Sequence, residues 1–161
     1  MNSKNLISTL LVVITSCNSN NTSQQFNIEA GTGFYAVNDL GEDLLNPNHP
    51  NSIDFDKIKI YFLINGEEVD AYDPNSDAPK GISLEIPNDK YNKYHLSLGF
   101  NIEENAEITY TIVQWNEQDR DTLKVQFNKG DNYLLAIKCW LNEELVWDVN
   151  NGQEKFFTLI K

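Results

Sequence analysis

From residue 57 to the C-terminus, apolar and polar side chains alternate along short segments that are separated by turn-forming residues. In the segment KIKIYFLI, for example, Ile58, Ile60, Phe62 and Ile64 all fall on one face. Side chains of a β-strand point alternately to opposite faces, so this period of two predicts strands with one buried face. The segments do not show the sustained period of 3.6 residues that is typical of an amphipathic helix.

The spacing of these segments predicts an all-β fold. An upstream strand is expected over 33–38, and the alternating segments that follow it are 57–64, 67–72, 82–87, 94–100, 107–115, 121–127, 133–141, 145–149 and 155–161. About eight or nine strands at this spacing favour an antiparallel β-sandwich, with an Ig-like or transthyretin-like arrangement. The dipeptide Asn65-Gly66 predicts a two-residue hairpin turn, because both residues tolerate positive φ.

The hairpin expected over 133–149 allows two registers. A two-residue loop pairs Trp140 with Leu145. A three-residue loop pairs Cys139 with Trp147 and also sets a lysine opposite an aspartate. The three-residue loop is favoured here because it keeps the apolar face of each strand inward, although two-residue loops are the commoner kind.

The first seventeen residues, MNSKNLISTLLVVITSC, have the layout of a secretory signal. Lys4 precedes an apolar run over 6–15, and small Ser16 comes directly before Cys17. Ten residues of helix reach only about 15 Å, which is half the hydrocarbon thickness of a bilayer, so the run is too short to span it. The sequence therefore predicts a cleaved leader.

The quartet Ile14-Thr15-Ser16-Cys17 resembles a bacterial lipobox. That resemblance implies that residues 1–16 are removed and that Cys17 carries a diacylglycerol thioether and an acylated amino group. Several acyl chains are needed for lasting attachment, since one chain holds only marginally. The expected division is a signal peptide over 1–16, a lipidated cysteine and flexible tether over 17–25, and a single β-sandwich domain over 26–161.

The charge of the chain limits its partners. The formal net charge is −12 at pH 7, and there is no cluster of Lys and Arg, so nucleic acid is not an expected partner. Some lipoproteins of the Bacteroidetes carry an acidic cluster directly after the cysteine, which sends them to the cell surface. Here the first acidic residue is Glu29. The expected location is therefore the outer membrane, with the periplasmic face favoured over the surface.

Several stretches resemble small lipoproteins of the Bacteroidetes. VNDLGEDLLNP followed by a hairpin with NG is similar to their opening, and DTLKVQF and IKCWLNEELVWD are similar to their closing strands. The resemblance supports the envelope location and the β-sandwich. It implies no particular activity.

No combination of residues indicates catalysis or a metal site. DPNSD, at 73–77, matches the first five positions of a calcium loop, but the required Gly and Glu are replaced by Ala78 and Leu84. Acidic residues of NEQDRD, at 116–121, are expected to be solvated at a hairpin tip. His49 and His95 lack the neighbouring ligands that zinc requires. The chain is therefore predicted to be a non-enzyme without cofactor or metal.

Aromatic residues give the remaining candidate site. Trp115 and Trp140 both fall on the less apolar face of their strands, where two indoles could stack against sugars. The alternative, which is favoured, is that they are packed in the core or half-buried. Cys139 lies in an apolar run and is expected to be a buried thiol.

These observations predict a membrane-anchored envelope lipoprotein that acts as a non-catalytic binding or assembly module. Its expected partners are the membrane, through lipid on Cys17, and a glycan or another envelope protein. The alternatives are a glycan-binding accessory protein of an outer-membrane uptake system and, less favoured, a hydrolase.

Overall fold

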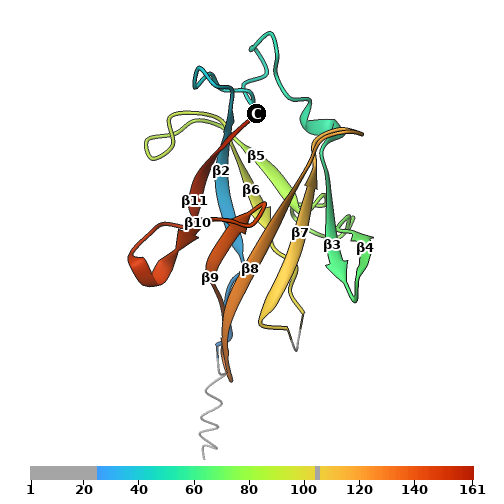
Figure 1. Cartoon of the computed structure of the whole chain (residues 1–161), viewed down its shortest axis with the longest axis vertical. Coiled ribbons are helices and arrows are strands. Elements are labelled where there is room, and N and C mark those ends of the chain that lie inside the picture. Colours follow the sequence, from blue (N-terminus) through green and yellow to red (C-terminus); the bar gives the residue numbers. More distant parts are fainter. Residues whose placement is uncertain (1–24, 104–105) are drawn as a thin grey trace, which may run out of the picture.

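Two β-sheets pack face to face around a common core (Figure 1). The computed structural model describes residues 25–103 and 106–161. The larger sheet contains β1 (Asn27–Glu29), β3 (Lys59–Ile64), β4 (Glu67–Asp70), β7 (Ile108–Gln114), β8 (Arg120–Gly130), β9 (Tyr133–Leu141) and β10 (Glu144–Asp148). The smaller sheet contains β2 (Gly31–Val37), β5 (Ile82–Glu85), β6 (His95–Gly99) and β11 (Phe156–Ile160). Two short 3₁₀ helices, η1 (Phe55–Lys57) and η2 (Val149–Asn151), complete the elements.

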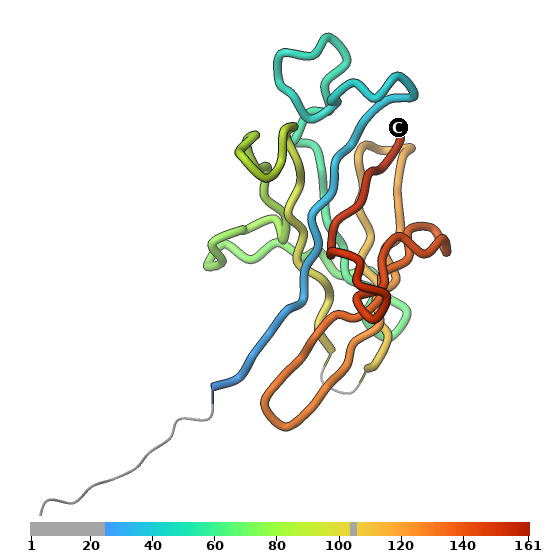
Figure 2. The backbone as a smooth tube through the Cα atoms, turned by 90° about the vertical axis from the view of Figure 1, so that its left-hand side faces the viewer, coloured from blue at the N-terminus to red at the C-terminus, as the bar shows by residue number. Residues whose placement is uncertain are grey.

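The predicted all-β sandwich is confirmed, and its two sheets are mixed rather than purely antiparallel. The larger sheet has the order β1-β9-β8-β7-β3-β4, with β10 also paired to β9, and the smaller has the order β11-β2-β6-β5. Strand β1 runs parallel to β9, and β11 runs parallel to β2. Figure 2 shows the light-blue strand β2 beside the red C-terminal strand β11. Alternation reveals which residues form a strand, but not which distant strand lies beside it.

The described residues form eleven strands, against the eight or nine expected. One short strand that no alternating segment predicted is β1, whose three residues are all exposed. Because no residue of β1 faces the core, it has no alternating pattern that the sequence could reveal. It is held by its pairing with the first residues of β9.

Both predicted hairpins form, and the second combines the two registers. Asn65 and Gly66 have positive φ values of 52° and 85° and join β3 to β4. Between β9 and β10 the chain turns through a two-residue loop, so that Trp140 pairs with Leu145. A bulge between Leu145 and Trp147 then shifts the register by one residue.

Beyond the bulge the pairing follows the favoured register. Cys139 lies opposite Trp147, and Lys138 lies opposite Asp148 with an Nζ–Oδ2 distance of 2.9 Å. A bulge inserts one residue into one strand, which is how both the common turn and the inward apolar face are kept. The preference for a three-residue loop was therefore wrong at the turn and right along the strands.

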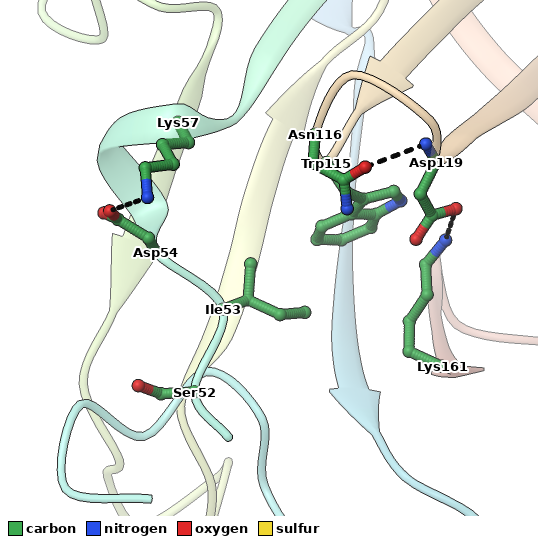
Figure 3. Close-up of a pocket in the computed structure, with 8 residues that line it drawn as sticks. All are labelled: Ser52, Ile53, Asp54, Lys57, Trp115, Asn116, Asp119 and Lys161. Atoms are coloured by element: carbon green, nitrogen blue, oxygen red, sulfur yellow. Dashed lines mark hydrogen bonds and ion pairs between the residues drawn. The ribbon is translucent and has the colours of Figure 1, made fainter. Parts of the chain in front are cut away.

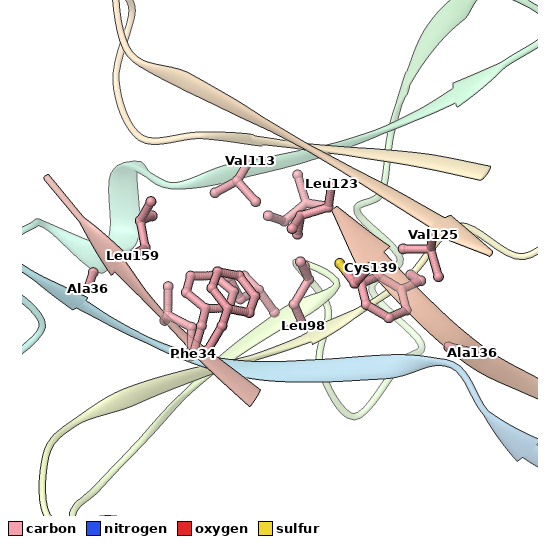
Figure 4. Close-up of a cluster of buried hydrophobic side chains, with 14 of the residues drawn as sticks. Phe34, Ala36, Leu98, Val113, Leu123, Val125, Ala136, Cys139 and Leu159 are labelled. Atoms are coloured by element: carbon pink, nitrogen blue, oxygen red, sulfur yellow. The ribbon is translucent and has the colours of Figure 1, made fainter. Parts of the chain in front are cut away.

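The core lies between the two sheets and contains side chains from both (Figure 4). Phe34 of β2 stacks on Phe157 of β11, with ring centroids 4.9 Å apart. Cys139 and Trp147 of the larger sheet are fully buried. The other labelled members of the cluster in Figure 4 are Ala36, Leu98, Val113, Leu123, Val125, Ala136 and Leu159. The prediction that Cys139 is a buried thiol is confirmed.

Strand β7 buries its more polar face, which its composition would place toward solvent. Thr109 and Thr111 are buried, whereas Ile108 is exposed. The two threonine hydroxyls serve the backbone of buried Asn101: Thr109 donates to its carbonyl at 2.8 Å, and Thr111 accepts from its N–H at 3.0 Å. Since the hydroxyls are satisfied, their burial carries little penalty. The same face continues to Trp115.

The predicted leader and Cys17 lie outside the described residues. Within the described part of the chain, no helix has the length and apolar character needed to cross a membrane.

Candidate functional site

A pocket of about 340 Å³ opens at the end of the sandwich that carries the C-terminus (Figure 3). One wall is the segment 52–57, which includes η1. The other is the turn between β7 and β8 together with Lys161. Figure 3 shows the side chain of Ile53 directed from the first wall toward the indole of Trp115.

Backbone hydrogen bonds hold the first wall in place. The N–H of Ile53 donates to the carbonyl of Leu44 at 2.7 Å. Asp54 caps η1 by accepting from the N–H of Asp56 at 3.1 Å, as short polar residues do at helix starts. The ammonium of Lys57 lies 3.3 Å from the carboxylate of Asp54, and both side chains are exposed at the rim.

The second wall is a turn that Asn116 stabilises. Its side-chain oxygen accepts from the N–H groups of Gln118 and Asp119, at 2.9 and 3.0 Å. This is the turn chemistry expected of asparagine. The N–H of Trp115 closes the turn by donating to the carbonyl of Asp119 at 2.9 Å.

Lys161 joins the C-terminal end of the chain to this turn. Its Nζ lies 2.8 Å from the carboxylate of Asp119, 2.5 Å from that of Asp121 and 4.9 Å from the ring centroid of Trp115. Its backbone N–H donates to the carbonyl of Val37 at 2.8 Å. The ammonium is therefore fixed over the indole face, which favours a cation.

Asp121 is the buried centre of this network. It accepts from Nε1 of Trp115 and from Nδ2 of Asn142, each at 2.7 Å, in addition to its contact with Lys161. Burial by itself raises the pKa of the Asp121 carboxyl, but hydrogen bonds from Lys161, Asn142 and Trp115 outweigh it and lower the pKa below its ordinary value. The carboxylate therefore stays charged.

The burial of Asp121 corrects the expectation of a solvated acidic tip. Glu117 of the same turn is exposed and Asp119 partly so, but Asp121 is only 6% exposed. The reason is long-range: donors from β9's end and from the C-terminus surround it. In the local sequence, only the alternation along β8 indicates that Asp121 is buried, because Asp121 shares a face with Leu123 and Val125.

The two predicted stacking tryptophans do not form a common platform. Trp115 is 4% exposed and belongs to the core, with only part of its indole bordering the pocket. Trp140 follows buried Cys139 on β9, so it points to the outer face of the larger sheet. There it is half-buried beside Lys124, whose Nζ lies 5.4 Å from the ring centroid. The favoured expectation, that the two tryptophans are packed in the core or half-buried, is therefore confirmed, and the alternative of a paired stacking platform is not formed.

The histidines lie away from the pocket, in separate surroundings. His49 accepts from the N–H of Asn51 at 3.1 Å and lies 3.5 Å from Glu42. His95 is on the outer face of the smaller sheet, where the rings of Tyr91 and Phe156 pack around it and bury it. Across residues 25–103 and 106–161, no group of three or more His, Cys, Asp or Glu side chains is arranged to hold a metal ion.

The pocket offers polar groups of both signs beside an aromatic edge. Lys57 and Lys161 are balanced by Asp54 and Asp119, so no net charge accumulates there. Such a lining can exchange hydrogen bonds with a neutral polar molecule. Sequence reasoning singled out Trp115 as a candidate, expected the acidic turn over 116–121 to be solvated, and missed Lys161, because the local sequence does not indicate where strand β11 places its last residues. Comparison of the chain with models of protein families, with curated proteins and with solved structures finds no match.

Proposed function

We propose that the chain is a lipid-anchored protein of the bacterial envelope and acts as a non-catalytic binding module. The anchor is the lipid on Cys17, in the outer membrane and with the domain on the periplasmic side. The ligand is a small neutral polar molecule of the carbohydrate class, held in the pocket beside Trp115. The observation that carries this proposal is the position of that pocket, at the end of the sandwich opposite the first described residues.

The lining supports a carbohydrate more than an ion or a substrate for catalysis. Hydroxyl groups of a sugar can both donate and accept, which suits the mixture of carboxylates, ammonium groups and the Asn116 amide around the pocket. Ser52 is the pocket's hydroxyl, but its neighbours in the lining include no histidine to act as a base. Binding without chemistry is therefore the better use of this site.

The charge of one exposed sheet edge favours ligand binding over assembly with another protein by strand addition. Strand β4 ends the larger sheet, and its residues are all exposed. Three of its four residues are acidic: Glu67, Glu68 and Asp70. Charged residues on an edge strand oppose pairing with another chain.

The anchor is tested by the intact mass of the protein recovered from bacterial membranes. We expect a chain that begins at Cys17 and carries additional acyl mass. The Cys17→Ser variant should lack the acyl mass and leave the membrane fraction. A wild-type chain that still begins at Met1 without modification would exclude the anchor.

The pocket is tested by titrating the protein with neutral oligosaccharides while following tryptophan fluorescence. In a Trp140→Phe background, we expect the response to persist because Trp115 borders the pocket. Lys57→Gln, at the rim, should weaken binding, whereas the matched change Lys124→Gln, on the outer face of the larger sheet, should leave it unchanged. Equal effects of the two lysine changes, or no response to any oligosaccharide, would argue against this ligand class.

A further inference from the structure

An exposed apolar groove of about 560 Å³ lies at the end of the sandwich away from the Trp115 pocket. Its apolar lining comes from three separate parts of the chain: Phe26 and Ile28 at the start of the domain, Ile102 after β6, and Tyr133 and Leu134 at the start of β9. The described chain begins at this end, beside the turn of the β8–β9 hairpin (Figures 1 and 2).

The apolar side chains of the groove are unusually exposed. Phe26 is 53% exposed, Ile28 is 56% exposed and Ile102 is 49% exposed. The ring of Tyr133 lies over Gly130, where a Cβ atom would collide with it, so glycine lets the ring form part of the floor. A group of large exposed apolar side chains marks an interaction surface more often than an isolated one does.

The predicted anchor lies within reach of this groove. Cys17 precedes Phe26 by nine residues. Since an extended chain advances at most about 3.6 Å per residue, this connection can hold the groove no further than about 32 Å from the lipidated cysteine. An anchor at Cys17 therefore brings this end of the sandwich, rather than the pocket end, to the membrane.

We propose that the groove is a second membrane contact, which seats Phe26, Ile28 and Ile102 in the interfacial region of a phospholipid bilayer. This inference rests on the anchor of the proposed function. Aromatic and aliphatic side chains partition into that region, and Tyr133 has the amphipathic ring that favours it. The contact would hold the domain upright, with the Trp115 pocket directed away from the lipid.

Charge at this end favours zwitterionic lipid. The tip of the β8–β9 hairpin carries exposed Asp131, and Glu107 is exposed at the neighbouring end of β7. The ammonium of Lys129 is directed to the carbonyl of Glu103, at 2.5 Å. With a net charge of −12 on the whole chain, anionic headgroups would repel the domain.

The test places a nitroxide spin label in the groove of the lipidated protein, reconstituted into phosphatidylethanolamine–phosphatidylcholine vesicles. Ile28→Cys and Ile102→Cys give two independent positions, and Leu40→Cys is the matched control. Leu40 is 82% exposed in the segment after β2, at the far end of the molecule. Cys139 is fully buried, so it does not compete for the label.

The expected result is a several-fold higher ratio of oxygen to nickel-complex collisions for labels at 28 and 102 than for the label at 40. Labels at 28 and 102 that are as accessible to the nickel complex as the label at 40 would overturn the contact. Labels that are shielded from both reagents and broadened by spin–spin coupling would also overturn it, because they indicate a second copy in the groove.

The outcome separates this inference from the anchor on which it rests. Vesicle flotation reports the anchor and does not depend on the groove, because the acyl chains dominate attachment. If the protein floats with the vesicles but its labels at 28 and 102 are exposed to water, only the proposal of the groove contact is excluded. Failure to float, together with an unmodified Cys17, removes the anchor and the contact together.

Discussion

The indole of Trp147 and the hydroxyl of Thr32 are hydrogen bonded across the two sheets, with Nε1 3.0 Å from Oγ1. Both residues are buried, and they are separated by 115 positions in the sequence. The same hydroxyl donates to the carbonyl of Lys155 at 3.0 Å, just before β11. One threonine therefore connects β10 of the larger sheet with both β2 and the entry to β11 in the smaller sheet.

Replacing Thr32 by valine should destabilise the fold by about 1–3 kcal/mol, because the buried indole N–H loses its acceptor. Trp147→Phe removes the donor and some packing, and should cost a similar or larger amount. The double variant should be less destabilised than the sum of the two single variants, because it has no buried indole N–H that lacks an acceptor. Denaturant unfolding of the four proteins measures this coupling, and additivity within about 0.5 kcal/mol would contradict it.

Much of the sandwich follows from residues that act locally. The Asn65-Gly66 turn and the strand over 133–141 were predicted where the structure has them. Each depends on φ preferences or on alternation, which a short stretch of sequence contains. The bulge after Leu145 was not predicted, although both conflicting registers were recognised.

What the sequence does not reveal depends on contacts between distant segments. The parallel pairings of β1 with β9 and of β11 with β2 are examples, since each strand lies beside a partner remote in sequence. The candidate site also depends on contacts between segments that are distant in the sequence. Trp115 could be singled out because the chain has only three tryptophans, but the ammonium that lies over its ring comes from Lys161, far along the sequence.

Asp121 should make the protein sensitive to acid. Its folded-state pKa is lowered, so its contribution to stability is present above the ordinary aspartate pKa of about 3.9 and is lost as the pH falls through the lower folded-state value. The Asp121→Asn variant should be less stable than wild type near neutral pH, and the difference should shrink as the pH falls to about 3. Denaturant unfolding at both pH values measures this.

The matched control for Asp121 is Asp56→Asn. The Asp56 side chain is 96% exposed and lies at the limit of ion-pair distance from Lys80, 4.0 Å away. Its removal should change the stability little at either pH, as is usual for exposed pairs. If both variants kept the pH dependence of the wild type, the Lys161–Asp121 network would not be a source of acid sensitivity.

Glu143→Gly should stabilise the β9–β10 hairpin. Glu143 has a φ of 70°, in the left-handed region that costs an ordinary residue about 1–2 kcal/mol. Glycine removes this cost but loses about 0.5–1 kcal/mol through its freedom in the unfolded chain, which leaves a net gain of about 0.5 kcal/mol. The lost ion pair with Lys124 is exposed on the glutamate side and contributes little. Thermal unfolding measures the gain.

The neighbouring residue provides the control for this turn. Glu144 begins β10 and is not among the residues with positive φ. Glu144→Gly should therefore lower the midpoint of thermal unfolding, because glycine adds chain freedom without relieving strain. Equal shifts in the two variants would mean that the backbone conformation of Glu143 carries no cost.

Cys139 should be unreactive in the folded protein. Its side chain is fully buried between the sheets, and burial raises the pKa of the thiol, so both access and the thiolate fraction are low. In a Cys17→Ser chain, Cys139 is the only thiol. We expect intact mass spectrometry to show no adduct after treatment with iodoacetamide under native conditions, and one adduct after unfolding in guanidinium chloride. Adding Ile28→Cys should give one native adduct, which shows that the reagent is active. Rapid native labelling of Cys139 itself would contradict the prediction, because it would mean that the core opens far more readily than the burial of Cys139 opposite Trp147 implies.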